Sequence, residues 1–327
     1  AFISRSGFAI LPPLPERDAP TPHSNFRRNG SSRLVPLNLA REYASSVEGF
    51  GRLRELLQNW IDRCRELGGG AIKAIASESD GALYVSLRSD QGGGDEKMAK
   101  GVVVGFIRQN ANGNTLLVNC RTALSPDVLI LGNSAKNDAK GGHRSRSLGH
   151  FGEGMKVEIN RLLAQGSDVY VFTGALVWQF GYEKAQFQNK DSLHAMIQKR
   201  SYFGHTCFAV SRAKKIDPTL YLFLLPSIPK SFPVHPNVPE SSMLKAIIPE
   251  TYIQILWDRK YGSKMYLGGM FVCNNFQFLP NLGLNFTGPI SHLRNGISRD
   301  RNQMRVDELF TFLPATLAIL HEQIRGS

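Results

Sequence analysis

The stretch that most constrains the fold of this chain is residues 52–67. At the 3.6-residue period of a helix, its apolar side chains fall on one side, and its polar side chains fall on the other. The apolar set is Leu53, Leu56, Leu57, Trp60, Cys64 and Leu67. The polar set is Glu55, Asn59, Asp62 and Glu66. The pattern predicts an amphipathic helix that packs one face on a hydrophobic core.

The polar side of this helix carries a Glu-x-x-x-Asn-x-x-Asp spacing. Glu55, Asn59 and Asp62 therefore project a carboxylate, a carboxamide and a second carboxylate along one stripe. Such a stripe is either an ordinary solvated face or a set of groups that orders a water, holds a metal ion and touches a ligand. The spacing alone leaves both interpretations open.

A second motif lies at residues 148–156, where Gly149, Gly152 and Gly154 precede a segment with helical periodicity. The apolar positions of that segment are Met155, Ile159, Leu162 and Leu163, and the helix is expected to end near Gly166. Glycines allow backbone N–H groups to close on an anion, and a helix N-terminus favours negative charge. The motif predicts a phosphate-binding loop; a plain glycine-rich turn is the alternative.

Three motifs, in this order, resemble those of the GHKL ATPases, the superfamily of gyrase, the heat-shock chaperones, histidine kinases and MutL. Residues 55–62 look like its N box. Residues 131–136, Leu-Gly-Asn-Ser-Ala-Lys, resemble the start of the ATP lid in chaperone-like and microrchidia-like members. Residues 149–156 are similar to its second glycine box. The resemblance covers residues 35–215.

The resemblance implies an α/β (α+β) fold, a two-layer α/β sandwich of the Bergerat type with a mixed sheet. A smaller transducer-like α/β region follows it. The implied function is binding of ATP and Mg²⁺, with hydrolysis that drives closure of a lid at residues 133–150, a conformational change and formation of a homodimer. Since Asn119 and Arg121 depart from the family, a nucleotide-binding or interaction module without turnover stays open.

The resemblance also assigns site residues. Glu55 is the expected general base, Asn59 the Mg²⁺ ligand, and Asp62 a nucleotide contact; Arg299 and Arg301 are the expected γ-phosphate contacts. The further nucleotide-binding positions are Asn119, Ser134, Lys136, Gly149, Phe151, Gly152, Gly154, Met155, Lys156 and Thr173.

The first glycine box of the family, Asp-x-Gly-x-Gly, corresponds here to Asn119, Cys120 and Arg121. In the family the Asp accepts a hydrogen bond from the adenine amino group. Asn119 still offers a carbonyl oxygen, but without the charge that strengthens such a bond. Arg121 takes the place of a glycine that lets the base approach. We therefore expect weaker recognition of adenine; a strand end at Asn119 is the alternative.

The order of elements divides the chain into an extended arm (1–36), an ATP-binding domain (37–215) and the transducer-like region (216–327), which we expect to continue beyond the chain. Helical structure is expected from Leu37 to a stop at Gly68. Strands are expected at 71–76, 82–87, 102–107, 116–118, 168–172, 175–180, 253–257 and 266–272. A closing amphipathic helix is expected at 306–324.

The formal net charge of +12 attracts polyanions, so a nucleic-acid-associated ATPase is a second alternative. An even distribution of the charge for solubility is the competing interpretation.

Four scattered cysteines without a Cys-x-x-Cys pair indicate reduced thiols in a cytoplasmic or nuclear protein and disfavour a zinc site. No apolar run is long enough to span a bilayer. The chain begins with Ala, so a targeting signal upstream stays open.

Overall fold

The computed structural model of this protein describes eleven segments of the chain. They are residues 32–44, 53–68, 72–79, 82–89, 102–129, 154–184, 190–225, 231–234, 253–256, 258–274 and 281–286. Every structural statement below refers to these segments.

A nine-stranded sheet forms the larger part of the structure, in the order β1-β8-β7-β6-β9-β5-β4-β3-β2. Every neighbouring pair of strands is antiparallel. The strands are β1 (Arg33–Ala40), β2 (Ile72–Ser79), β3 (Ala82–Ser89), β4 (Val103–Gln109), β5 (Thr115–Asn119), β6 (Val169–Thr173), β7 (Leu176–Lys184), β8 (Asp191–Lys199) and β9 (Thr206–Val210). Short 3₁₀ turns follow β1 (η1, Arg41–Ala44) and β5 (η3, Pro126–Leu129).

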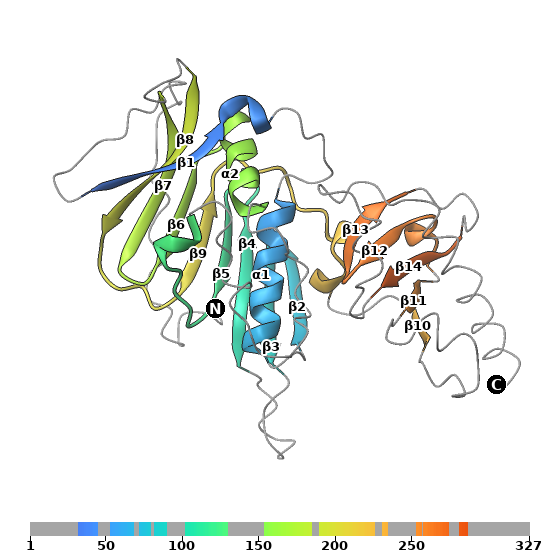
Figure 1. Cartoon of the computed structure of the whole chain (residues 1–327). Coiled ribbons are helices and arrows are strands. Elements are labelled where there is room, and N and C mark those ends of the chain that lie inside the picture. Colours follow the sequence, from blue (N-terminus) through green and yellow to red (C-terminus); the bar gives the residue numbers. More distant parts are fainter. Residues whose placement is uncertain are drawn as a thin grey trace, which may run out of the picture.

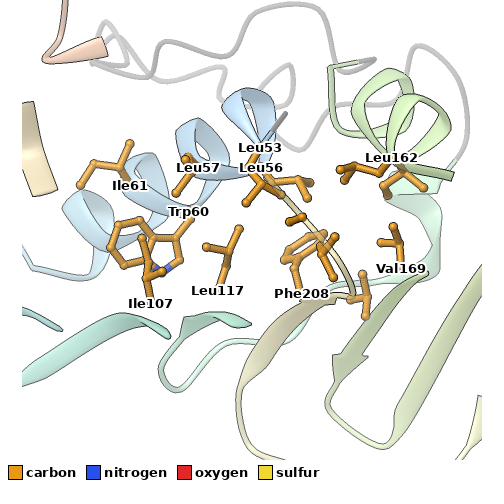
Figure 2. Close-up of a cluster of buried hydrophobic side chains, with 14 of the residues drawn as sticks. Leu53, Leu56, Leu57, Trp60, Ile61, Ile107, Leu117, Leu162, Val169 and Phe208 are labelled. Carbon is orange, nitrogen blue, oxygen red and sulfur yellow. The ribbon is translucent and has the colours of Figure 1, made fainter. Parts of the chain in front are cut away.

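Two helices, α1 (Arg54–Leu67) and α2 (Gly154–Ala164), lie against one face of this sheet (Figure 1). The apolar side of α1 points at the sheet, where Leu56, Leu57 and Trp60 meet residues of β4, β5 and β9 (Figure 2). Leu162 of α2 packs beside Val169 in the same core. Burial of an amphipathic face in this way is the main source of helix stability in proteins.

Two features bring α1 close to the sheet. The indole Nε1–H of Trp60 donates a buried hydrogen bond of 2.9 Å to the carbonyl oxygen of Val118 in β5. A Cβ at Gly105 of β4 would lie 2.7 Å from that same carbonyl and would collide with Cys64 of α1. The absence of a side chain at Gly105 is therefore what allows the helix to approach.

Asn160 connects α2 to strands β1 and β7 of the large sheet. Its amide Nδ2 donates to the carbonyl of Ala40 at the end of β1 (2.9 Å), and its Oδ1 accepts from the Tyr182 hydroxyl in β7 (2.8 Å). Asn160 is completely buried, so these bonds satisfy a side chain that would otherwise be costly to bury.

A second sheet of five strands has the order β10-β11-β14-β12-β13. Its strands are β10 (Ser231–Val234), β11 (Ile253–Leu256), β12 (Met265–Leu267), β13 (Met270–Cys273) and β14 (Gly283–Phe286). The pair β12–β14 is parallel and the other pairs are antiparallel. Three 3₁₀ turns accompany it, η4 (Pro218–Leu220), η5 (Leu222–Leu224) and η6 (Arg259–Tyr261).

The second sheet contacts α1 through Arg65. The Arg65 guanidinium donates to the carbonyl of Gly268, in the turn between β12 and β13 (3.1 Å), and lies 6.0 Å from the centre of the Phe223 ring in η5. Tyr221, Leu224 and Met270 also belong to the core that lies under α1. The two sheets are thus joined by side-chain contacts as well as by the chain.

The predicted fold class, a two-layer α/β sandwich of the Bergerat type, is wrong. The structure is mostly β: the large sheet is entirely antiparallel where a mixed sheet was expected, and the described residues contain only two α-helices. In the region after residue 216, the described elements are strands and 3₁₀ turns, so the α/β character expected there is not observed either.

The individual elements explain the error. Residues 37–40 pair with β8 as part of β1, so the helix expected from Leu37 is wrong there. Pro36 argues against a central strand, but β1 lies at the end of the strand order, where a missing N–H is tolerated. Strands β8, β9, β10 and β14 were not predicted at all. The helices at α1 and α2 and the strands at β2 to β7 and β11 are confirmed, whereas the single strand expected at 266–272 is in fact the two antiparallel strands β12 and β13, with a turn at Gly268 and Gly269 between them.

Two expected features lie outside the described residues: the closing helix at 306–324 and the lid at 133–150. None of the described helices is both long enough and apolar enough to cross a membrane. All four cysteines are free and buried, as expected for reduced thiols.

The backbone of Arg121 predicts a stabilising substitution. Arg121 is exposed and has φ +54°, a left-handed conformation that favours glycine. Replacing it with Gly removes a penalty of about 1–2 kcal/mol, against an entropy loss of about 0.5–1 kcal/mol. We expect Arg121→Gly to raise the free energy of unfolding by about 0.5–1 kcal/mol in urea titrations with an unchanged m-value.

The matched control is Arg108→Gly, at an exposed arginine inside β4. There the glycine has no left-handed strain to relieve and should lower stability. Equal effects of the two glycines on the urea midpoint would contradict the argument from φ.

Candidate functional site

Glu55 of α1 contacts Gly154, the first residue of α2. A Cβ built at Gly154 would overlap the Glu55 carboxylate, so the carboxylate can take up this position only because residue 154 is a glycine. The first N–H groups of a helix carry partial positive charge and favour an anion nearby. The structure therefore brings the predicted base and the end of the glycine motif together, although they are far apart in the chain.

A cluster of buried charged groups surrounds this contact. Glu158, one turn after Gly154 on α2, is 1% exposed, and its Oε2 lies 3.5 Å from the guanidinium of Arg161. Arg54 of α1 is 5% exposed. Burial raises the pKa of Glu158 to about 7; the negative charge of Glu55 adds to the increase, while Arg161 and Arg54 oppose it.

Tyr221, just before η5, completes this cluster from the side of the second sheet. Burial is the main cause of the raised pKa of its hydroxyl. The positive charge of Arg54 lowers this pKa, and the negative charges of Glu158, Asp217 and Glu55 raise it further. The phenol is therefore neutral at physiological pH, and it carries no charge into the cluster.

A row of polar side chains crosses three strands on the helix-covered face of the sheet. Asn119 of β5 is directly opposite Thr206 of β9, and Thr206 is directly opposite Thr173 of β6. All three are buried. The Thr173 and Thr206 hydroxyls lie 3.2 Å apart and share a hydrogen bond. The predicted nucleotide contacts Asn119 and Thr173 thus belong to one row, joined by Thr206.

This row also fixes the loop that follows β5. The backbone N–H of Leu124 donates to the Thr173 hydroxyl (2.7 Å), and the Thr206 hydroxyl donates to the carbonyl of Thr122 (3.2 Å). The Thr122 hydroxyl donates in turn to the carbonyl of Asn119 (3.1 Å). Residues 119–124 are therefore held against the ends of β6 and β9 by threonine side chains.

The Asn119 side chain is hydrogen-bonded to α1. Its amide Nδ2 donates to the carbonyl oxygen of Trp60 (3.0 Å) and to Sγ of Cys64 (3.2 Å). These contacts use the donor end of the amide and join β5 to the helix. The assigned contact with adenine would use the carbonyl end, and it stays a prediction.

Arg121 lies at the edge of the same loop. Its backbone N–H donates to Nδ1 of His205 (2.9 Å), which requires that nitrogen to be unprotonated. Burial, and secondly the positive charge of Arg121, lower the pKa of His205. The imidazole is therefore neutral at physiological pH and serves as an acceptor that orders the turn.

The remaining predicted residues on the two helices differ in accessibility. Asn59 is half-buried and lies one turn after Glu55. Asp62 is 4% exposed, and its negative charge acts on Arg65. Met155 is half-buried against the core, and Lys156 is completely buried, so its ammonium group lies inside the protein.

The other predicted site residues lie outside the described residues. They are Ser134, Lys136, Gly149, Phe151, Gly152, Arg299 and Arg301. The approach of the lid and of the two arginines to Glu55 therefore stays a prediction.

Two residues with a place in this geometry were missed in the sequence, Thr206 and Glu158. Thr206 is followed directly by four apolar residues, a strand signal that would have placed its hydroxyl at the strand end. Glu158 is a charged residue within the apolar periodicity of α2, one turn after Gly154. A charge at such a position is rarely buried without a partner.

Comparisons with known proteins do not assign this chain to a family. No model of a known protein family matches the chain, and no curated protein matches it. Among the described residues there is also no group of three or more His, Cys, Asp or Glu side chains placed to hold a metal ion.

The Asn119 contacts predict the effect of Asn119→Asp. A carboxylate of the same shape loses the donor to Trp60 and places a negative charge against a carbonyl oxygen at a site only 4% exposed. We expect a loss of about 2–4 kcal/mol in the free energy of unfolding at neutral pH. The loss should shrink as the pH falls, because a protonated carboxyl can donate again.

The matched control is Asn110→Asp, where the side-chain oxygen accepts from the Asn114 backbone N–H in an exposed turn. A carboxylate can keep that acceptor role, so little change is expected in the same denaturation measurement. An Asn119→Asp protein as stable as this control would show that the Nδ2 contacts contribute little.

Proposed function

We propose that this protein binds ATP and hydrolyses it in a Mg²⁺-dependent reaction at the junction of α1 and α2. The observation that carries the proposal is the contact between the Glu55 carboxylate and Gly154 at the N-terminus of α2. A carboxylate beside backbone N–H groups combines a proton acceptor with donors for phosphate oxygens, which are the groups that phosphoryl transfer to water needs.

Glu55 is the general base in this proposal. Its carboxylate would accept a hydrogen bond from the attacking water and orient it toward the terminal phosphate. The N-terminus of α2 would face the phosphate oxygens, since the N–H groups of a helix's first turn and the helix dipole favour negative charge. Gly154 keeps the two groups close, because it has no side chain between them.

The side chains near Glu55 fit a magnesium ion. Mg²⁺ keeps several waters and is usually bound through one or two protein oxygens together with substrate phosphates. Asn59 offers one amide oxygen, is half-buried and lies one helical turn from Glu55. When bound, the ion neutralises charge on the phosphates. A site of this kind needs no cluster of three acidic or imidazole ligands.

The polar row Asn119–Thr206–Thr173 is the proposed contact for the base of the nucleotide. Hydroxyl and amide groups on the helix-covered face of the sheet can exchange hydrogen bonds with a planar heterocycle. Since Asn119 Nδ2 already donates to Trp60, we expect selectivity between adenine and guanine to be low.

The substitution Glu55→Gln tests the base. The amide has the size of the carboxylate but cannot accept the proton, so we expect ATP hydrolysis to fall about 10²–10⁴-fold. Affinity for ATP in calorimetry should change little, because a base acts in the transition state. Glu66→Gln, at an exposed glutamate on the same helix, is the control and should leave both quantities unchanged.

Loss of ATP binding and hydrolysis together in Glu55→Gln would make Glu55 structural. Absence of hydrolysis in the unsubstituted protein, with binding retained, would favour the alternative of a binding module without turnover.

The substitution Gly154→Ala tests the contact that positions Glu55. The new Cβ must displace the Glu55 carboxylate, which is the end of a flexible side chain, so folding should tolerate it. Inside a helix alanine is about 1 kcal/mol more favourable than glycine; Gly154 is the first residue of α2, so only part of that gain is expected and stability should change little. Hydrolysis should fall by up to about 10²-fold, the effect expected of a 1 Å displacement.

Ala164→Gly, in the last turn of α2, makes the reverse substitution far from Glu55 and is the control. It should lower the melting temperature and leave hydrolysis unchanged. A Gly154→Ala protein with full activity would show that the position of Glu55 at α2 is irrelevant to turnover.

A further inference from the structure

Strands β2, β3 and β4 carry positive charge on the face of the large sheet opposite the two helices (Figure 1). Successive side chains of a strand point to opposite faces. Ala74 of β2 and Ile107 of β4 belong to the core beneath the helices, so their neighbours Lys73 and Arg108 lie on the other face. Arg88 of β3 is directly opposite Lys73 and lies on that face as well.

The acidic residue of these strands does not compensate these charges. Glu78 is the one Asp or Glu in the sequences of β2, β3 and β4, and its register partner is Leu83, a residue of the helix-covered core. Lys73 and Arg108 are exposed, and Arg88 is half-buried. This corner of the helix-free face is therefore positive and open to solvent.

The arrangement of the charges is unfavourable within the described chain. Like charges directly opposite each other on two strands, as in Lys73 and Arg88, destabilise a sheet. None of the three positive groups forms an ion pair with a described residue. Elsewhere on the surface, Arg63 and Arg212 each lie within 3.4 Å of a carboxylate oxygen. An external anion would supply the missing countercharge.

Apolar surface lies beside these charges. Tyr84 of β3 is half-buried and directly opposite Arg108, and its ring centre lies 6.2 Å from that of Phe106 in β4. Ile75, two residues after Lys73 on the same face of β2, is 45% exposed. An aromatic ring and an exposed aliphatic side chain thus accompany the three positive groups.

We propose that this basic patch, formed by Lys73, Ile75, Tyr84, Arg88 and Arg108, binds single-stranded nucleic acid. Single-strand binders combine positive groups that follow the phosphate backbone with aromatic rings on which bases stack, and sheet faces with aromatic side chains are a common platform for RNA. The formal net charge of +12 favours the approach of such a polyanion.

The strand register gives each group its place. Lys73 and Arg88 form one phosphate-binding pair. Arg108 is opposite Tyr84, four residues from Arg88 along β3, or about 13 Å at about 3.3 Å per residue. Tyr84 and Ile75 contact a base between these phosphate contacts. The members come from three strands, so no basic run in the sequence marks the patch. The site lies on the face opposite Glu55 and is independent of the proposed hydrolysis.

The test is fluorescence anisotropy of the full chain, without nucleotide, with a fluorescein-labelled oligothymidylate of about 20 nucleotides, longer than most single-strand sites. Three phosphate contacts predict a slope of about −2 for the logarithm of the binding constant against the logarithm of salt concentration. Lys73→Gln and Arg108→Gln should each reduce this slope by about 0.7 and weaken binding about five-fold at about 0.1 M salt. Lys73→Gln also removes the repulsion with Arg88, so it should not lower stability.

Lys199→Gln, at an exposed lysine that ends β8, is the matched control and should change neither quantity. An equal loss of binding in this control would assign the interaction to overall charge and overturn the proposal. No binding of the oligonucleotide by the unsubstituted protein overturns it too. Vesicles containing phosphatidylserine distinguish the other polyanion: if Lys73→Gln and Arg108→Gln weaken binding to vesicles but not to the oligonucleotide, the patch binds a membrane surface instead.

Tyr84→Leu tests the contact with a base. Leucine keeps apolar volume against Phe106 but cannot stack, so affinity for the oligothymidylate should fall about five-fold or more with an unchanged salt slope. Binding of a duplex of the same length, whose bases are already stacked, should not respond. The control is Tyr202→Leu, at a tyrosine 75% exposed outside the patch. An unchanged affinity in Tyr84→Leu overturns the assignment of a single-stranded ligand.

Discussion

The close approach of α1 to strands β4 and β5 is the contact on which the rest of the structure depends. It needs a glycine at residue 105, the buried bond from Trp60 to Val118 and the amide of Asn119 beneath the helix. Once α1 is fixed there, its N-terminal turn meets α2, and its C-terminal turn presents Arg65 to the second sheet. One helix thereby holds the candidate site and the connection between the two sheets.

The helices and most strands followed from local patterns, but the fold class did not. The 3.6-residue period of residues 52–67 and the glycine stop at Gly68 located α1, although helical structure was wrongly expected from Leu37 as well. Strand pairing is different, because β5 pairs with β9 and β1 pairs with β8, segments far apart in the chain. No local signal specifies such partners. In addition, β1 contains Pro36 and Asn38, two residue types that are depleted in strands, and the structure accommodates Asn38 with a left-handed φ.

The candidate site shows the same limit. Glu55 and Gly154 were each recognisable from their own motif, and their contact depended on tertiary structure that the spacing cannot give. Thr206 and Glu158 carry no motif; their relevance appears only when the strand register places one beside Asn119 and the helix places the other one turn from Gly154. Asn119 was recognisable as unusual, but its role in holding α1 could not be known without the partner carbonyl.

The irregular strand β1 has a consequence for how copies of this chain can associate. Open sheet edges invite another chain to add a strand, and proteins prevent this with prolines, bulges and charges. At the described end of the large sheet, β1 has a proline at position 36, a shift in register between Pro36 and Ala40, and an exposed arginine at its start. A continuous intermolecular sheet would therefore lack a donor and lose register there. A homodimer that extended the large sheet would have to do so at an edge other than β1.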